Sequence, residues 1–468
     1  MPVSKLTNKK ISIANKTFLS KSSLPLYLIL TSKKISKLAM FVDDLKSMIS
    51  LKETIQSFNS DLEVIIFPEF DCKFFSNMSP TRNILSERAN ALFNLVNTQR
   101  KRYIFLGTYE SLISKTIHKS EFTKRTLKLK TNLEDSYNSI IVFLKENMYE
   151  KVDFVRNKGE FSIRGEIVDI YSPCEDQPAR LVFDFERLET LTKFDENTQK
   201  SKKRIDSYNL CPASEIIFND DSIRNFRENF RKFGIENRDE FYKAISNNVY
   251  ITGREQFFPI MYNSFSSIID YLKDFCILLG EDFMDKFLFN HEKMTNNSVL
   301  IQNKNCRTSN YYLNKSELEY GLDKCKKIFL FFKFLSKNNS NLFSEDILFS
   351  FDKHKNLENI KRSIKNTNSK YFFCFDSKTN KKKIINWFKE NSISYKYEPT
   401  FDEKILANQN KINILNCFIS SSFEILRFSK NKCFFLSEND FFEKIIKKKT
   451  ITKKNSDDII NEFSKLAI

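Results

Sequence analysis

The side chains best placed to bind another molecule belong to a predicted antiparallel sheet within residues 159–199. Two strands, FSIRGEIVDIY and RLVFDFE, are joined by the turn sequence SPCEDQP. Because successive side chains of a strand point to opposite faces, alternation predicts that Arg180 faces outward, and we expect Arg164 on the same exposed face. The apolar positions of the second strand are expected to face a core: Leu181, Phe183 and Phe185.

Guanidinium groups suit the binding of carboxylates, because their fork of N–H donors can make two parallel hydrogen bonds. Arginines that simply face solvent on a sheet are nevertheless commoner than arginines in a binding hot spot. The residues alone therefore leave both interpretations of Arg164 and Arg180 open.

Patterns typical of catalysis, metal binding or nucleotide hydrolysis are missing from the sequence. His118, His291 and His354 are far apart, and the nine cysteines include no C-x-x-C pair. No glycine precedes Gly107 and no G-K-[ST] occurs, so the chain lacks the loop that cradles phosphates. We predict no catalytic residues, no metal and no cofactor for this chain, although the question of an enzyme stays open.

Composition is typical of a protein of several domains. A length of 468 residues with 41% hydrophobic content predicts about three or four domains. The 76 Lys+Arg against 59 Asp+Glu give a net charge of +17, which hints at an anionic partner. Lys, Asn, Ile and Phe are raised together, as in AT-rich genomes, so this charge is weak evidence for DNA binding. Unpaired cysteines and the short apolar runs predict a cytoplasmic protein without membrane spans.

Strands and helices alternate in the first part of the chain, which predicts a parallel α/β sheet. The predicted strands are 26–31, 62–71 and 102–113, with helices over 36–51 and 79–96, and residues 1–24 are expected to form a helix or arm. The segments 249–262 and 267–280 are expected to complete the sheet. A second α/β pattern follows, with strands at 371–376, 412–419 and 432–442. In its helix, Ile384, Trp387 and Phe388 are expected to be core.

The order of motifs resembles the N-terminal half of the bacterial transcription-repair coupling factor family, Mfd. The motifs are FPEFD, SPTRNILSERANALFNL, GTYESL, GEFSIRGEIVDIY, PARLVFDFERLETLTKFDENTQKS, NLCPASEI, GREQFFPIMY and FLSENDFFEKIIKKK. The resemblance covers about residues 20–468 and is most specific over 159–201. The related repair protein UvrB shares the first module but would carry an intact Walker A loop near its start.

The resemblance implies a degenerate P-loop-like parallel-sheet domain with an inserted small antiparallel β-rich domain, followed by a second small α/β domain. The expected boundaries are 1–118 for the first piece of the α/β domain, which lacks a Walker A loop; 119–208 for the inserted domain; 209–330 for the second piece; 331–350 for a linker; 351–450 for the small α/β domain; and 451–468 for a C-terminal helix or linker.

In the family the inserted domain docks the repair protein UvrA, and the arginines that matter fall on Arg164 and Arg180. A pair of phenylalanines that adds an aromatic contact reads Phe183-Asp184 here, which weakens the apolar part of the expected surface. This interpretation requires both guanidinium groups on one side of the sheet and not both locked in internal ion pairs.

The family's polymerase-binding domain and ATP-driven motor would follow where this sequence stops. We therefore expect a non-catalytic module of transcription-coupled nucleotide excision repair, with UvrA as partner and RNA polymerase contacted only indirectly. The alternatives are half of a split ATP-dependent DNA translocase acting with a separately encoded helicase half, or a weak, nonspecific binder of damaged DNA. In the family, ATP is bound only by the motor, so no ATP site is expected in this chain.

Four further residues have plainer interpretations. Glu87 and Arg88 are expected to form an ordinary surface pair on a helix. Asp195 and Gln199 are expected to cap or brace the predicted sheet.

Overall fold

The computed structural model describes residues 12–18, 22–58, 62–74, 76, 78–97, 102–131, 136–230, 238–262, 265–280, 282–296, 308–325, 327–332, 357–358, 360–362, 364, 369–402, 404–407, 409–428 and 431–442. The chain divides into two compact units, one of residues 1–19 and 24–334 and one of residues 20–23 and 335–468. Most of the predicted linker and the whole predicted segment 451–468 lie outside the described residues.

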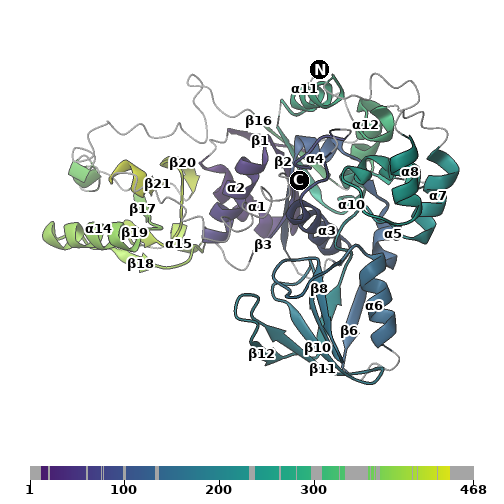
Figure 1. Cartoon of the computed structure of the whole chain (residues 1–468). Helices are drawn as coiled ribbons and strands as arrows, with labels where there is room; N and C mark the ends of the chain where they lie inside the picture. Colours follow the sequence, from purple (N-terminus) through teal and green to yellow (C-terminus); the bar gives the residue numbers. More distant parts are fainter. Residues whose placement is uncertain are drawn as a thin grey trace, which may run out of the picture. The chain divides into compact units, whose positions relative to one another are not determined.

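A six-stranded parallel sheet forms the centre of the first unit (Figure 1). In spatial order its strands are β1 (Ser12–Phe18), β16 (Lys327–Phe332), β15 (Cys276–Gly280), β2 (Lys37–Val42), β4 (Tyr103–Thr108) and β3 (Glu63–Phe67). Strand β4 is buried at all six positions, as expected when helices cover both faces of a parallel sheet. Because β15 and β16 follow the inserted domain in sequence, the sheet is assembled from two separate pieces of chain. The predicted α/β architecture is confirmed.

The N-terminal elements differ from the prediction. Residues 26–31 belong to helix α1 (Leu24–Lys34), whereas the predicted helix over 36–51 is strand β2 followed by α2 (Leu45–Phe58). The strand β1 also replaces the expected N-terminal helix or arm. Leu26, Leu28 and Ile29 are all buried, so the run is apolar on most sides and its pattern does not separate a strand from a buried helix.

Helices cover both faces of this sheet. In Figure 1, α1 and α2 lie on one side, and α3 (Arg82–Val96), α4 (Tyr109–Ile113) and α10 (Ile268–Tyr271) lie on the other. The further elements of the unit are β5 (Thr116–Ile117), α5 (Lys119–Lys124), α7 (Asp220–Phe230), α8 (Arg238–Ser246), η2 (Arg254–Phe257), α9 (Phe258–Met261), β14 (Phe265–Ser266), α11 (Phe283–Asn296), η4 (Thr308–Asn310) and α12 (Lys315–Asp323).

The segment 249–262 does not complete the sheet, contrary to the prediction. It forms η2 and α9, in which Pro259 occupies the first turn, a position where the missing N–H has no cost. The second predicted segment does contribute a strand, β15.

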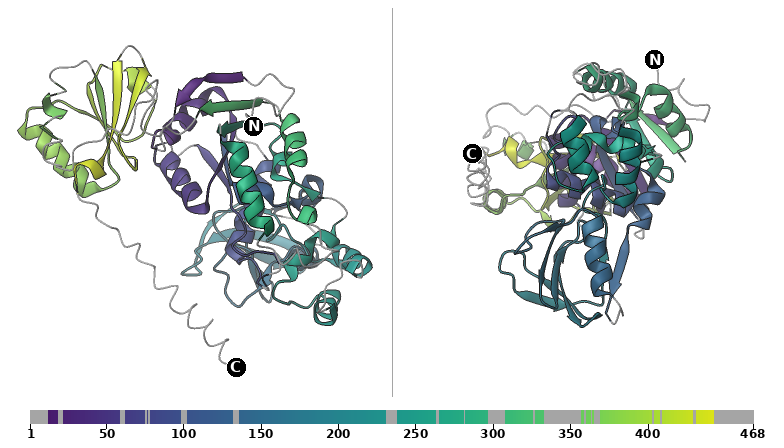
Figure 2. Two further views of the ribbon diagram at one scale, coloured as in Figure 1. Left: turned by 90° about the horizontal axis from the view of Figure 1, so that it is seen from above. Right: turned by 45° about the vertical axis from the view of Figure 1, so that its right-hand side comes forward.

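The inserted domain contains a six-stranded sheet in the order β12-β11-β10-β9-β8-β7. Its strands, coloured blue to teal, lie in the lower part of the right-hand view of Figure 2. The strands are β7 (Glu150–Lys151), β8 (Glu160–Arg164), β9 (Ile167–Tyr171), β10 (Ala179–Asp184), β11 (Arg187–Phe194) and β12 (Ser201–Arg204). All neighbours pair antiparallel except β7 and β8. Helix α6 (Tyr137–Glu146) and the strand pair β6 (Leu127–Lys130) and β13 (Ser207–Leu210) share its hydrophobic core, which lies on one face of the sheet.

The second unit has a five-stranded sheet. Its strands in spatial order are β18 (Lys396–Glu398), β19 (Ile412–Leu415), β17 (Lys370–Cys374), β21 (Asn431–Ser437) and β20 (Phe423–Phe428), with α14 (Lys378–Glu390), α15 (Lys404–Ala407) and η5 (Glu438–Asp440). Ile384 and Phe388 of α14 are fully buried, and Trp387 packs against the same core, which confirms the predicted core role of this stripe.

Candidate partner-binding surface

Two arginines lie on the face of the inserted sheet opposite its hydrophobic core. Arg164 ends β8, and Arg180 lies in β10, directly opposite Asp169 of the intervening strand β9. Asp169 also pairs with Ser162, two residues before Arg164. Because side chains two positions apart share one face of a strand, the register brings both guanidinium groups over one aspartate.

Asp169 is fully buried and binds both arginines. Arg180 donates from Nε to Oδ1 at 2.8 Å and from Nη2 to Oδ2 at 3.0 Å, a bidentate pair. Arg164 donates from Nη2 to Oδ2 at 2.5 Å. The pKa of Arg180 is raised above its usual value, because the hydrogen bonds to Asp169 outweigh the opposing effect of burial. We name this group, Arg164, Asp169 and Arg180, the arginine cluster.

The arginine cluster corrects the sequence interpretation. The two guanidinium groups lie on one side of the sheet, but both are in ion pairs with the same carboxylate. The requirement that the two arginines are not both locked in internal ion pairs is therefore not met, and the hypothesis of docking by two unpaired arginines is wrong. Two guanidinium charges against one carboxylate leave one positive charge in excess, and the side chain of Arg164 is 44% exposed, against 20% for Arg180.

Aromatic side chains surround the arginine cluster. The Cζ atom of Arg164 lies 5.7 Å from the ring centre of Phe154, which is 53% exposed, and that of Arg180 lies 5.0 Å from buried Phe194. At such distances a guanidinium is attracted to the negative face of the ring. The two contacts further fix the directions in which the arginines point.

The predicted aromatic contact at Phe183 is also corrected. Phe183 is 2% exposed and packs edge-to-face on Tyr137, with ring centres 5.1 Å apart, so it belongs to the core. Asp184 is exposed at the end of β10. Phe185, which alternation placed in the core, is instead 84% exposed.

The local backbone explains the exposure of Phe185. The pairing of β10 with β11 shifts register between Val182 and Phe183, and Phe185 adopts a left-handed conformation with φ of 51° in the turn. The extra residue of this bulge is Glu189 of β11, so β10 keeps its alternation through Asp184. Phe185 lies beyond the end of β10, in the turn, where period-two alternation does not apply. Sequence reasoning missed Phe185 for that reason, and missed Asp169 because it judged the arginines without their neighbouring strand.

Comparison with known proteins finds a family model that covers the inserted domain. Residues 127–216 match the family model described as the UvrB interaction domain. The transcription-repair-coupling factor of Rickettsia prowazekii (strain Madrid E) is 28% identical over 372 residues, which are 77% of this chain and 32% of that protein.

The chain resembles the transcription-repair-coupling factors.

Two other coupling factors show the same relationship over shorter stretches. That of Rickettsia bellii (strain RML369-C) is 34% identical over 45% of this chain and 19% of its own length. That of Haemophilus influenzae (strain ATCC 51907 / DSM 11121 / KW20 / Rd) is 29% identical over 49% and 20%. The matched regions thus span between about a fifth and a third of these coupling factors.

The helix α3 of this coupling-factor-like chain carries a buried arginine that sequence reasoning assigned to the surface. Arg88 is fully buried, and donates from Nε to Glu215 Oε1 and from Nη1 to the carbonyl oxygen of Pro68, each at 2.6 Å. Its guanidinium lies between the rings of Phe67 and Phe70, at 3.9 and 4.0 Å. The prediction that Arg88 forms a surface pair with Glu87 is therefore wrong. The sequence did indicate burial, because Arg88 has helical spacing with Leu92 and Leu95 and so shares their apolar stripe.

Asp195 and Gln199 brace the sheet, as predicted. Asp195 Oδ1 accepts the backbone N–H of Thr198 at 2.8 Å, and its Oδ2 lies 2.9 Å from Lys202 Nζ. Gln199 donates to the carbonyl oxygen of Val155 at 2.9 Å and has a left-handed φ of 58°. The turn between β11 and β12 is thus tied to the loop that carries Phe154.

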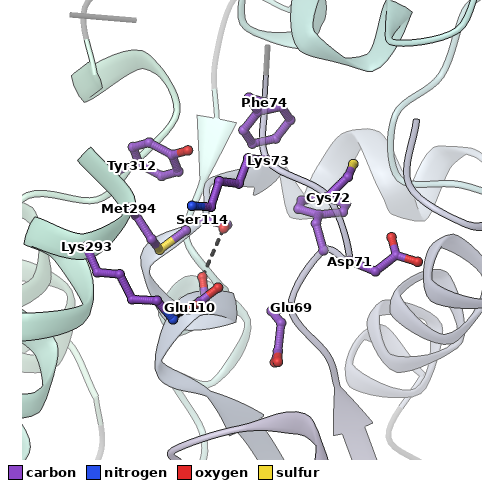
Figure 3. A pocket seen from close by; sticks show the side chains of 11 residues that line it. Glu69, Asp71, Cys72, Lys73, Phe74, Glu110, Ser114, Lys293, Met294 and Tyr312 are labelled. Atoms are coloured by element: carbon purple, nitrogen blue, oxygen red, sulfur yellow. Dashed lines mark hydrogen bonds and ion pairs between the residues drawn. The ribbon is translucent and has the colours of Figure 1, made fainter. Parts of the chain in front are cut away.

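A cavity of about 230 Å³ lies at the carboxyl edge of β3 and β4 (Figure 3). Parallel sheets usually bind nucleotides at this edge. Here its lining includes three carboxylates, Glu69, Asp71 and Glu110, and Lys293 Nζ is held by Glu110 at 2.7 Å. Burial raises the pKa of the Cys72 thiol to about 12, so this lining thiol stays protonated and is a poor nucleophile.

Within the described ranges, no group of three or more His, Cys, Asp or Glu is arranged to hold a metal ion. Among those same residues, no helix combines the length and apolar character that a membrane span requires.

Proposed function

We propose that this chain is a module of transcription-coupled nucleotide excision repair whose inserted sheet docks UvrA. The observation that carries the proposal is the arginine cluster, which lies on the face of the sheet opposite its hydrophobic core, within the residues that match the UvrB interaction domain. The role is binding, with no bond made or broken by this chain.

The arginine cluster favours docking because it is preorganised. Asp169 and the two flanking rings hold the guanidinium groups in place, so little side-chain freedom is lost when a partner binds. The excess positive charge attracts a carboxylate, and between described residues the side chain of Arg164 uses only its Nη2 as a hydrogen-bond donor. Its remaining N–H groups are free to bind a UvrA carboxylate.

Two exposed phenylalanines add apolar area to the proposed surface. Phe154 lies beside Arg164, and Phe185 lies in the turn after β10. The backbone N–H of Phe183 donates to Glu166 O at 2.9 Å, so this turn lies next to the β8–β9 turn that follows Arg164. Arginines and aromatic residues together are typical of binding hot spots. We propose that Phe185 supplies the aromatic group that the carboxylate of Asp184 cannot provide.

A pull-down with purified UvrA tests this function. We expect wild-type chain to be retained and the Arg164→Ala/Arg180→Ala variant to be washed off. The matched control is Arg224→Ala, because Arg224 is an exposed arginine of α7 paired with Asp221. Equal retention of the double variant and the wild type would contradict the proposal. If the Arg224→Ala control is also lost from the UvrA resin, retention depends on the overall positive charge of the chain and not on the arginine cluster.

A further inference from the structure

A second cavity lies where the inserted domain meets the parallel-sheet domain. It has a volume of about 540 Å³, in the range of sites for small molecules. Ser79 and Arg82 line it at the start of α3, and Lys145 and Lys151 line it beside β7. A further part of its lining is formed by Asn248, Tyr250, Arg254 and Glu255. The site is distinct from the arginine cluster, and nothing in the proposed UvrA docking uses it.

Arg254 is buried in the wall of this cavity with too few partners. Its side chain is 9% exposed, and its Cζ lies 4.1 Å from the ring centre of Phe218 and 4.9 Å from that of Tyr250. The nearest carboxylate oxygen, Glu255 Oε1, is 3.7 Å from Nε, which is beyond hydrogen-bond distance. Within the described part of the chain, Nε has no hydrogen-bond partner. A buried guanidinium in this condition is a strong candidate to bind an anion.

The charges around Arg254 also favour an anion. Arg82 is paired with Glu150, and Glu255 accepts the Ser79 hydroxyl at 2.5 Å, so both carboxylates of the lining are engaged. Lys145 and Lys151 are exposed and have no ion pair with any residue that the structure describes. Four cationic side chains face two carboxylates, which leaves two positive charges in excess.

Two lining residues other than glycine adopt left-handed backbone conformations. Met148 has a φ of 69° and Asn248 a φ of 53°. Such conformations are unfavourable for most side chains and are concentrated at binding sites, where the surroundings maintain them. Asn248 precedes Tyr250, whose ring is 61% exposed beside the guanidinium of Arg254.

We propose that this cavity binds a small phosphorylated ligand of nucleotide size. The phosphate contacts Arg254 and the two lysines, and the exposed ring of Tyr250 offers a surface on which a planar base can stack. The phosphate could be supplied by a free nucleotide or by a single strand of DNA, and the chemistry of recognition is the same for both.

Calorimetric titration of the full chain tests the site with three probes: pyrophosphate, ADP and a short single-stranded DNA. The variants are Lys145→Gln/Lys151→Gln, which changes exposed residues only, and Arg254→Met, which keeps the packing stem. The matched control is Lys128→Gln/Lys130→Gln, two exposed lysines of β6 outside the cavity.

We expect pyrophosphate and ADP to bind wild type and control alike, and both site variants to bind at least about tenfold more weakly, as when a charged hydrogen bond is removed. If only the single-stranded DNA binds, and both site variants weaken its binding, the phosphate site stands but the proposal of a small ligand is overturned. Absence of saturable binding, or equal binding by Lys145→Gln/Lys151→Gln and wild type, would overturn the proposal.

Discussion

At the scale of single residues, Asp169 determines what the two arginines can do. A carboxylate that is fully buried is costly unless charged donors satisfy it, and here three N–H groups from two arginines do so. The same bonds hold both guanidinium groups at the surface of the sheet. Asp169 therefore contributes both to the stability of the inserted domain and to the geometry of the proposed docking surface.

The first prediction concerns Asp169→Asn. The amide cannot accept the charged bidentate pair, and the free energy of unfolding in urea should fall by about 2 kcal/mol, the contribution of a hydrogen bond to a charged group. Asp184→Asn is the control, because Asp184 is exposed in the same sheet and should leave the urea midpoint unchanged. Equal midpoints for Asp169→Asn and wild type would show that the ion pairs are not stabilising.

The second prediction concerns pH. The hydrogen bond from Lys202, and then the backbone N–H of Thr198, hold the pKa of Asp195 well below its usual range. A carboxyl whose pKa is lower in the folded state stabilises the fold fully above its unfolded pKa, about 3.9, and loses this contribution as pH falls toward the folded pKa.

Asp195→Asn should therefore be less stable than wild type by a constant amount between pH 7 and 5. The difference should shrink below about pH 4. Urea unfolding measured across this range checks it, with Glu196→Gln in the same turn as control. A difference that does not change with pH would contradict the lowered pKa.

Sequence reasoning at this scale succeeded where strands are regular and failed where they are not. Alternation correctly placed Arg180 outward and Leu181 inward along β10. It failed at Phe185, because this residue lies past the end of β10 in a turn with a left-handed backbone conformation, where the period of two does not apply. Asp169 could not be recognised as the partner of both arginines, since the register of β8, β9 and β10 is set by pairing across the sheet.

At the scale of elements, Arg88 joins three segments that are distant in sequence. Its guanidinium links α3 to the end of β3 through Pro68 O and to the return segment through Glu215. Glu215 in turn accepts a hydrogen bond from Thr116. Burial lowers the pKa of Arg88 and the adjacent Glu215 opposes that effect.

The third prediction is a double-mutant cycle on this pair. Arg88→Met should lower the free energy of unfolding by about 3–5 kcal/mol, because it leaves the carboxylate of Glu215 buried without its charged partner. Arg88→Met/Glu215→Leu should be less destabilised than the sum of the single variants, by at least about 1 kcal/mol. Additive losses in chemical denaturation would contradict a direct coupling between the two side chains.

Helix and strand assignment from sequence was reliable only where a pattern discriminates between them. In the inserted sheet the segment RLVFDFE is a strand as predicted, but FSIRGEIVDIY, predicted as one strand, forms two, β8 and β9, joined by a turn at Gly165. Helix α14 is also predicted correctly, and its buried Ile384 and Phe388 are four residues apart. The all-apolar run in α1 has no such period. It was predicted as a strand and the following segment as a helix, whereas the structure has helix α1 followed by strand β2. Tertiary burial, which a single sequence does not display, decided the outcome there.

At the scale of the whole molecule, the chain combines a parallel-sheet scaffold with an inserted sheet that offers a basic face. The resemblance to the coupling factors implied this architecture, including a first domain built from two pieces. The order of strands in the parallel sheet could not be predicted, because β15 and β16 join β1 and β2 across long sequence separations. The division into two units is likewise a property of three-dimensional contacts.

The fourth prediction is competition. The match to the UvrB interaction domain leads us to expect that the chain and UvrB use the same surface of UvrA. Added chain should slow formation of the UvrA–UvrB complex in a surface-binding assay, and the Arg164→Ala/Arg180→Ala variant should not. If the rate of UvrA–UvrB complex formation does not change when the chain is added, the expectation that the chain and UvrB use the same surface of UvrA is contradicted.

The affinity of the chain for UvrA tests the central claim most directly. Calorimetric titration should be carried out on wild type, on Arg164→Ala/Arg180→Ala and on the Arg224→Ala control at one salt concentration. If the arginine cluster docks UvrA, the double variant should bind at least about 30-fold more weakly, corresponding to a hot-spot loss of about 2 kcal/mol. The control should match the wild type. Equal dissociation constants for the double variant and the wild type would contradict the account.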